Sequence, residues 1–218
     1  MSAATLASLQ AALAQIYDLP AMPDVLQYLL TDRARLDGIA GARASDEQLI
    51  VAEQDDTLSL GLYIDARVLE RLAQRDPYDA LTGHNLADYL TVAEGVSHFV
   101  YVAWNAAFDK PVTLLELELQ AEIDKYVLCA WLLREQGAGR FPRELHRALF
   151  ERVRIDPAAA DRAGLYQAAS WYAQRFCGRV ARSLARGTRT AMRELLTELR
   201  RFYRLGNARK LRYIERCA

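Results

Sequence analysis

The sequence predicts a mainly α-helical protein, a helical bundle with one small antiparallel β-hairpin at about residues 48–64. Ala, Leu and Arg, which favour helices, dominate the 218 residues. Only 11 Gly and 6 Pro interrupt the chain, and 52% of it is hydrophobic, which is enough to build a core. Apolar residues recur mostly at spacings of three and four, the helical period, whereas residues 58–64 alternate strictly between apolar and other residues, as in a strand.

The N-terminal part reads as packing elements around this hairpin. A first helix is expected from Leu6 to Ile16, and Pro20 ends it. Pro23 then opens a second helix that runs through Leu30, and a polar loop follows at 33–44. A two-stranded hairpin is marginally stable alone, so we expect it to lie on the helices or to pair with the edge of a partner.

Two central helices, at about 84–107 and 113–136, are joined by a turn at 109–111. The segment 85–107 contains no Lys or Arg, which predicts a helix that is largely enclosed. In the second helix, Thr113 and Glu116 have the spacing of a capping box.

The second central helix carries polar residues where a core is expected. One arc is bordered by Leu on both sides and so should face the antiparallel first helix, near Glu94 and His98. A second arc is predicted to face water. The enclosed arc holds Glu118, Glu122, Lys125 and Cys129, and the water-facing arc holds Glu116, Gln120 and Asp124.

Three interpretations of the enclosed cluster stay open. It is a paired hydrogen-bonded network, because buried charges are normally paired; or it is a general acid/base site, with His98, Glu122 and Lys125 as candidate catalytic residues; or it is a metal site. The candidate metal ligands are Glu94, His98, Glu118 and Glu122. Because the chain has one Glu-x-x-x-His and no repeated Glu-x-x-His, the spacing does not match a di-iron bundle. No cofactor is predicted.

Charge divides the chain at 137–139. Residues 1–139 hold 9 Lys+Arg and 21 Asp+Glu, a net charge of −12, and residues 140–218 hold 19 and 7, a net charge of +12. We therefore predict an acidic helical core at 1–136, with the hairpin and the central helix pair, and a basic helical part at 140–218 packed on it, as one domain or two.

The basic part carries a regular row of arginines. The spacing of four, three and four continues beyond the first helix if Gly187 does not break it. The row comprises Arg175, Arg179, Arg182, Arg186, Arg189 and Arg193. Guanidinium groups on one ridge repel one another unless anions lie alongside. Two interpretations stay open: the acidic and basic halves are each other's partner, within one chain or across a homo-oligomer, or the arginines bind an external acidic protein surface or nucleic-acid backbone.

The remaining features narrow the class. The three Cys lack a Cys-x-x-Cys pairing, which favours a reducing cytoplasm, and the N-terminus has no basic region of a signal peptide. No run of about 18 apolar residues predicts a membrane span. Phosphate-binding loops, nucleophile elbows and His-Glu-x-x-His are absent from the sequence. We therefore expect a non-enzymatic interaction or adaptor protein whose basic C-terminal helices engage an acidic partner. The alternative is an enzyme with a Glu/His/Lys site between the two central helices.

Overall fold

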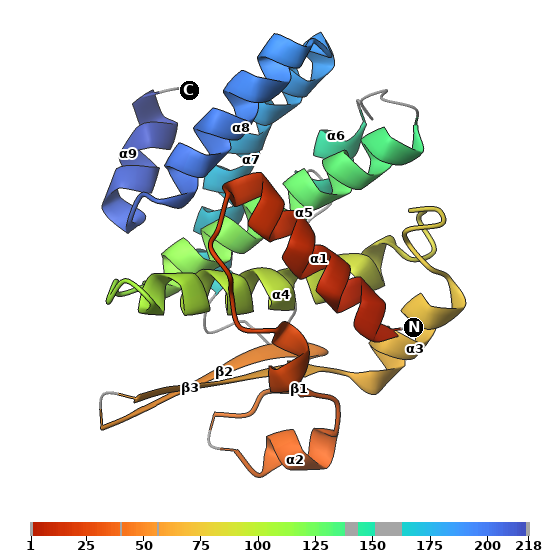
Figure 1. Cartoon of the computed structure of the whole chain (residues 1–218), viewed down its shortest axis with the longest axis vertical. Coiled ribbons are helices and arrows are strands. Elements are labelled where there is room, and N and C mark those ends of the chain that lie inside the picture. The colour runs from red at the N-terminus through yellow and green to blue at the C-terminus, as the bar shows by residue number, and fades with distance from the viewer. Residues whose placement is uncertain (1, 40, 56, 138–143, 151–162, 217–218) are drawn as a thin grey trace. The chain divides into compact units, whose positions relative to one another are not determined.

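The computed structural model describes residues 2–39, 41–55, 57–137, 144–150 and 163–216, and these residues form a mainly helical fold with a small three-stranded sheet (Figure 1). The predicted fold class is confirmed. The pattern of contacts divides the chain into two compact units. Unit 1 comprises Met1–Ala12 with Leu19–Pro111, and unit 2 comprises Leu13–Asp18 with Val112–Ala218. The division predicted from charge stays a prediction, because residues 138–143 lie outside the described residues.

The sheet of unit 1 has the strand order β1-β3-β2. Strands β2 (Glu47–Gln54) and β3 (Thr57–Ile64) form the predicted antiparallel hairpin. Strand β1 (Leu29–Leu30) pairs parallel with Leu62 and Tyr63 of β3. The prediction of a two-stranded element was therefore one strand short.

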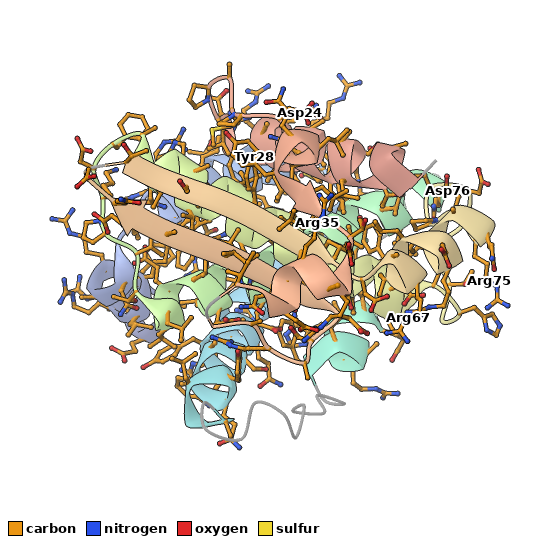
Figure 2. All side chains as sticks on the ribbon, turned by 90° about the horizontal axis from the view of Figure 1, so that it is seen from below. Asp24, Tyr28, Arg35, Arg67, Arg75 and Asp76 are labelled. Carbon is orange, nitrogen blue, oxygen red and sulfur yellow. The ribbon has the colours of Figure 1, made fainter. Side chains whose placement is uncertain are left out.

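Local capping by aspartates explains why the segment before the hairpin is not the single helix that the sequence predicts. Asp24 accepts a hydrogen bond from Leu26 N and starts the short 3-10 helix η1 (Val25–Tyr28), after which the chain turns into β1. The Tyr28 ring lies 5.0 Å from the ring of Phe99, which anchors the segment (Asp24 and Tyr28 are labelled in Figure 2). Asp32 starts α2 (Arg33–Asp37) in the same way, where a loop was predicted.

Helix α3 (Ala66–Gln74) follows β3 directly and is capped by Asp65. The Asp65 carboxylate accepts hydrogen bonds from the backbone and side chain of Arg67, which lower its pKa to about 2. Arg71 binds the Asp88 carboxylate with two nitrogens, at 2.6 Å for the shorter contact, and so joins α3 to α4 (Leu86–Ala106). Across the described residues, every helix is too short or too polar to span a lipid bilayer.

Helix α4 packs on β2 and β3, and 13 of its 21 residues are buried, so the predicted enclosure is confirmed. Gly95 is the point of closest approach. A Cβ at this position would lie 2.8 Å from Glu47 Cγ and 2.9 Å from a methyl group of both Leu62 and Ile64. The absence of a side chain at residue 95 therefore sets the distance between helix and sheet.

Unit 2 consists of α5 (Leu114–Gln136), α6 (Leu145–Phe150), α7 (Ala163–Arg186), α8 (Arg189–Tyr203) and α9 (Asn207–Arg216), with the last turn of α1 (Ser2–Tyr17). Helix α5 packs on α6, α7 and α9, and α7 packs on α8 (Figure 1). Thr113 caps α5 through the amide of Glu116, as predicted. Gly187, with φ of +65°, ends α7, so the predicted arginine row does not continue on one helix.

Replacing Gly95 by Ala is expected to destabilise the protein by about 1–2 kcal/mol, because overpacking against the sheet outweighs the roughly 1 kcal/mol gain in helix propensity. Chemical denaturation measures the change. Gly164→Ala in α7 is the matched control, because the space around Gly164 is open, and it should leave stability unchanged or raise it. Equal effects at the two positions would contradict the close packing of α4 on the sheet.

Candidate functional site

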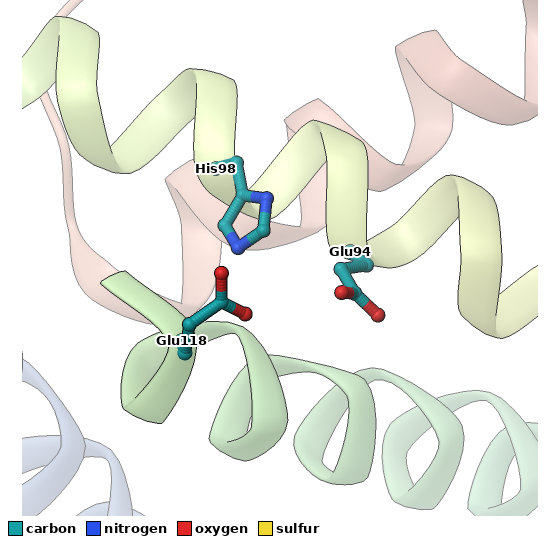
Figure 3. Close-up of side chains that lie close together, drawn as sticks. All are labelled: Glu94, His98 and Glu118. Atoms are coloured by element: carbon teal, nitrogen blue, oxygen red, sulfur yellow. The ribbon is translucent and has the colours of Figure 1, made fainter. Parts of the chain in front are cut away.

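Two of the predicted site residues, Glu94 and His98, lie one turn apart on α4, and both side chains are seen in Figure 3. One carboxylate oxygen of Glu94 and one ring nitrogen of His98 lie within 4.8 Å of each other. His98 is buried, and its Nδ1 is 3.4 Å from Oε1 of Glu47 on β2. The sequence did not indicate Glu47 as a partner, because the contact joins residues 51 positions apart.

The other predicted residues lie on α5. Glu118 is buried, whereas Glu122 and Lys125 are partly exposed and form an ion pair of 2.6 Å within one helical turn. Cys129 is fully buried. Burial raises the pKa of its thiol to about 12, although the charge of Lys125 acts in the opposite direction. The thiol is therefore protonated at neutral pH and, in contrast to the thiolate of a reactive cysteine, is a poor nucleophile.

The arc of α5 predicted to face water is in fact buried. Glu116, Gln120 and Asp124 are at most 2% exposed, so that prediction was wrong. The α-helical period groups these residues correctly, but it cannot reveal that other helices surround them.

These residues belong to a buried network that the sequence did not suggest. Tyr17 OH donates a hydrogen bond to Asp124 Oδ1. Gln120 Nε2 donates to the same oxygen at 2.7 Å, and Lys210 Nζ donates to Gln120 Oε1 at 2.5 Å. The network connects the end of α1, α5 and α9.

Lys210 is the most unusual member, because its side chain is fully buried. Its ammonium nitrogen lies 5.1 Å from the centre of the Phe202 ring and 5.8 Å from that of Tyr203. Burial lowers the pKa of Lys210 to about 7, against the opposing effect of the carboxylates of Glu116 and Asp124. The only local signal is that Lys210 is four residues before the buried Ile214.

The side chains of Glu116 and Tyr17 are also held in place by contacts within unit 2. Glu116 Oε2 accepts a hydrogen bond of 3.0 Å from the amide of Asn207, at the start of α9, where a negative charge is favoured by the helix dipole. The Tyr17 ring stacks on Tyr203 at 4.1 Å. Burial and the neighbouring Asp124 raise the pKa of the Tyr17 hydroxyl well above 10.

Other basic side chains of unit 2 also have structural partners. Arg179 forms an ion pair of 2.7 Å with Glu198 and lies over the ring of Tyr213. Arg200 and Arg204 donate hydrogen bonds of 3.0–3.2 Å to main-chain carbonyls at the end of α1. These arginines cap that helix, whose last carbonyls lack partners within the helix. Arg179, Arg200 and Arg204 therefore have structural roles.

Three arginines of the predicted row remain on one exposed face of α7. Arg175, Arg182 and Arg186 are exposed, and Arg175 lies 4.6 Å above the ring of Trp171, itself 47% exposed. We call Trp171, Arg175, Arg182 and Arg186 the arginine stripe. With 3.6 residues per turn, they fall within about 60° of one another and extend over about 22 Å. Arg189 and Arg193 lie beyond Gly187, on α8.

Within the described residues, no carboxylate lies in ion-pair distance of the three arginines of the stripe; Arg186 instead donates a hydrogen bond to Ser183 Oγ. A shallow, open groove follows the neighbouring helix α8. It is lined by Arg193, Glu194, Thr197, Glu198, Arg201 and Tyr213. Because carboxylates alternate with arginines there, the groove is less suited to anions than the stripe is.

Comparison with protein-family models, with curated proteins and with solved structures finds no match to this chain.

Lys210 should make stability depend on pH. Its pKa is about 7 in the folded chain against an ordinary 10.5. Between these values the unfolded chain binds more protons, so the free energy of unfolding rises with pH. From pH 7 to pH 9 we expect a gain of about 2 kcal/mol relative to Lys210→Met, measured by urea denaturation. Parallel curves for the two proteins would contradict a lowered pKa of Lys210.

Proposed function

We propose that this protein is a non-enzymatic interaction protein whose arginine stripe on α7 engages an acidic partner. The observation that carries the proposal is the exposed alignment of Arg175, Arg182 and Arg186 beside Trp171. Guanidinium groups held on one face of a helix repel one another, and a partner that presents a row of anions relieves this repulsion. Residues 162–193 contain seven Arg and no Asp, Glu or Lys, so α7 itself carries no acidic side chain beside the stripe.

The contacts of the other arginines of unit 2 support the stripe as the binding surface. Arg179, Arg200 and Arg204 hold structural contacts within unit 2, which explains part of its basic composition without a partner. The arginines of the stripe have no comparable structural role among the described contacts. Aromatic and arginine side chains are also the residue types enriched at the centres of protein interfaces.

The geometry favours an acidic protein surface over a nucleic-acid backbone. Stacking of bases on aromatic rings is a main source of affinity for single strands, and the Arg175 guanidinium already covers one face of the Trp171 ring. Three arginines on one helix face also contact few phosphates. Binding to DNA in preference to acidic polypeptides would reverse this assignment.

Replacing Arg175, Arg182 and Arg186 together by Gln should weaken binding to immobilised polyglutamate by about 3- to 150-fold at low salt, because each exposed charge pair contributes roughly 0.2–1 kcal/mol. Biolayer interferometry measures the dissociation constant, with duplex DNA as the second probe.

The matched control replaces Arg209, Arg212 and Arg216 of α9 by Gln, which removes the same charge from another exposed surface. We expect this variant to bind polyglutamate nearly as the wild type does. Equal losses in both variants would mean that net charge alone, and not the stripe, drives binding.

A second candidate function is metal binding by Glu94 and His98, two of the metal ligands predicted from the sequence, and one contact in unit 1 favours it. A carboxylate on one ring nitrogen orients a histidine and leaves the other nitrogen as the ligand, and Glu47 is placed to do this at His98 Nδ1. Glu94, one turn earlier, adds an oxygen ligand from the same face of α4. Such a donor set suits Zn²⁺ or Mn²⁺.

If this second function holds, protein dialysed with Zn²⁺ or Mn²⁺ should retain one ion per chain in elemental analysis. His98→Gln should abolish retention, and Glu47→Gln should weaken affinity about 10- to 100-fold. His84→Gln, at an exposed position, is the control and should retain the ion. Retention by the His98 variant equal to that of the control would remove α4 as a metal site.

A further inference from the structure

One face of the hairpin in unit 1 is part of the core at one end and exposed at the other end, near the turn. Glu47, Leu62 and Ile64 meet α4 at Gly95, and residues two positions apart on a strand point to the same face. The same face therefore continues to Val51 and Leu58, which are 50% and 36% exposed. An apolar strip thus extends beyond the region that α4 covers.

Acidic side chains accompany this strip. Glu53 lies opposite Leu58 in the register, and Asp55 occupies the turn with φ of +47°; both are exposed. We call Val51, Glu53, Asp55 and Leu58 the acidic tip. Residues 44–66 contain six Asp or Glu and no Lys or Arg. Within unit 1, Arg35, Arg67 and Arg75 lie towards the end of the sheet opposite to this turn (Figure 2).

The acidic tip and the arginine stripe are complementary in three respects. The carboxylates of Glu53 and Asp55 match the guanidinium groups in charge. The apolar side chains of the tip match the exposed indole of Trp171. The exposed part of the hairpin, about four residues or 13 Å long, also fits along the stripe of about 22 Å.

We infer that the acidic partner of the arginine stripe is the acidic tip of a second copy of this chain, an inference that rests on the proposed function. Each copy then offers one tip and one stripe, so the contact is head-to-tail and joins copies into rings or open chains. The contact is smaller than a standard interface, so assembly requires concentrations on the order of 100 µM. Because the Debye length is about 10 Å at 0.1 M salt, assembly weakens as salt is added.

The test measures molar mass by light scattering after size exclusion at about 10–300 µM protein, in low salt and in about 0.5 M salt. The wild type should form assemblies in low salt that dissociate in high salt. A tip variant, with Glu53→Gln and Asp55→Asn, should stay monomeric, because it lacks the two carboxylates of the tip. Asn tolerates the positive φ of residue 55, so the turn should keep its conformation. The stripe variant with three Gln replacements should also stay monomeric.

Mixing the two variants gives the decisive result. The stripe variant keeps an intact tip and the tip variant keeps an intact stripe, so the mixture should form a one-to-one dimer that cannot grow further. A monomeric wild type, a monomeric mixture, or assembly that persists in both single variants would each overturn the inference. Assembly unaffected by salt and by both sets of replacements would indicate pairing between β2 edges instead.

A further measurement separates this inference from the proposed function. The tip variant should bind polyglutamate as the wild type does, because its stripe is intact. If the wild type is monomeric and the stripe still binds polyglutamate, the proposed function stands and the second copy is rejected as partner. If the stripe variant binds polyglutamate as the wild type does, the proposed function itself fails. Circular dichroism spectra equal to the wild type confirm that the variants fold.

Discussion

The buried carboxylate of Asp124 is the group on which the packing of unit 2 depends. It accepts hydrogen bonds from Tyr17 and Gln120, and Gln120 in turn accepts from Lys210, so three segments distant in sequence share one network. An isolated charge in such surroundings would destabilise the fold by several kcal/mol. The partners compensate that cost only in one arrangement of α1, α5 and α9, so the network favours a unique packing over a merely compact one.

Basic residues of the C-terminal half have three distinct roles that composition alone cannot separate. Lys210 lies in the core, Arg200 and Arg204 complete the end of α1, and Arg182 and Arg186 face water. All five contribute equally to the formal charge of the basic half. Their surroundings differ in hydration and in available acceptors, which decides whether a positive charge makes contacts within the chain or stays hydrated.

The local parts of the fold were predictable because their causes are local. Alternation marked β3, the lack of Lys and Arg marked the enclosure of α4, and the hydroxyl of Thr113 marked the start of α5. Strand β1 was not predictable, because two residues, Leu29 and Leu30, adopt strand geometry only through pairing with β3.

The candidate sites were likewise predictable only where their geometry has a local cause. The spacing of Glu94 and His98 placed both on one face of α4, but nothing local pointed to Glu47, and the burial of Asp124 and Lys210 depends on helices that meet only in the folded chain. The arginine row was visible in the sequence. Gly187 divides the row between two helices because of its backbone conformation, which the sequence did not settle. Arg179 leaves the row because it forms an ion pair with Glu198, a tertiary contact.

The short length of β1 has a consequence for how copies of the chain avoid one another. Because β1 pairs with only Leu62 and Tyr63, the half of β3 near the turn has an outer edge, and β2 is the opposite edge strand of the sheet. Such edges are templates for uncontrolled strand addition between chains. Glu53 and Asp55 carry like charges at this place, so two hairpins repel each other edge to edge. The carboxylates that we infer to engage the arginine stripe therefore also protect the sheet from aggregation.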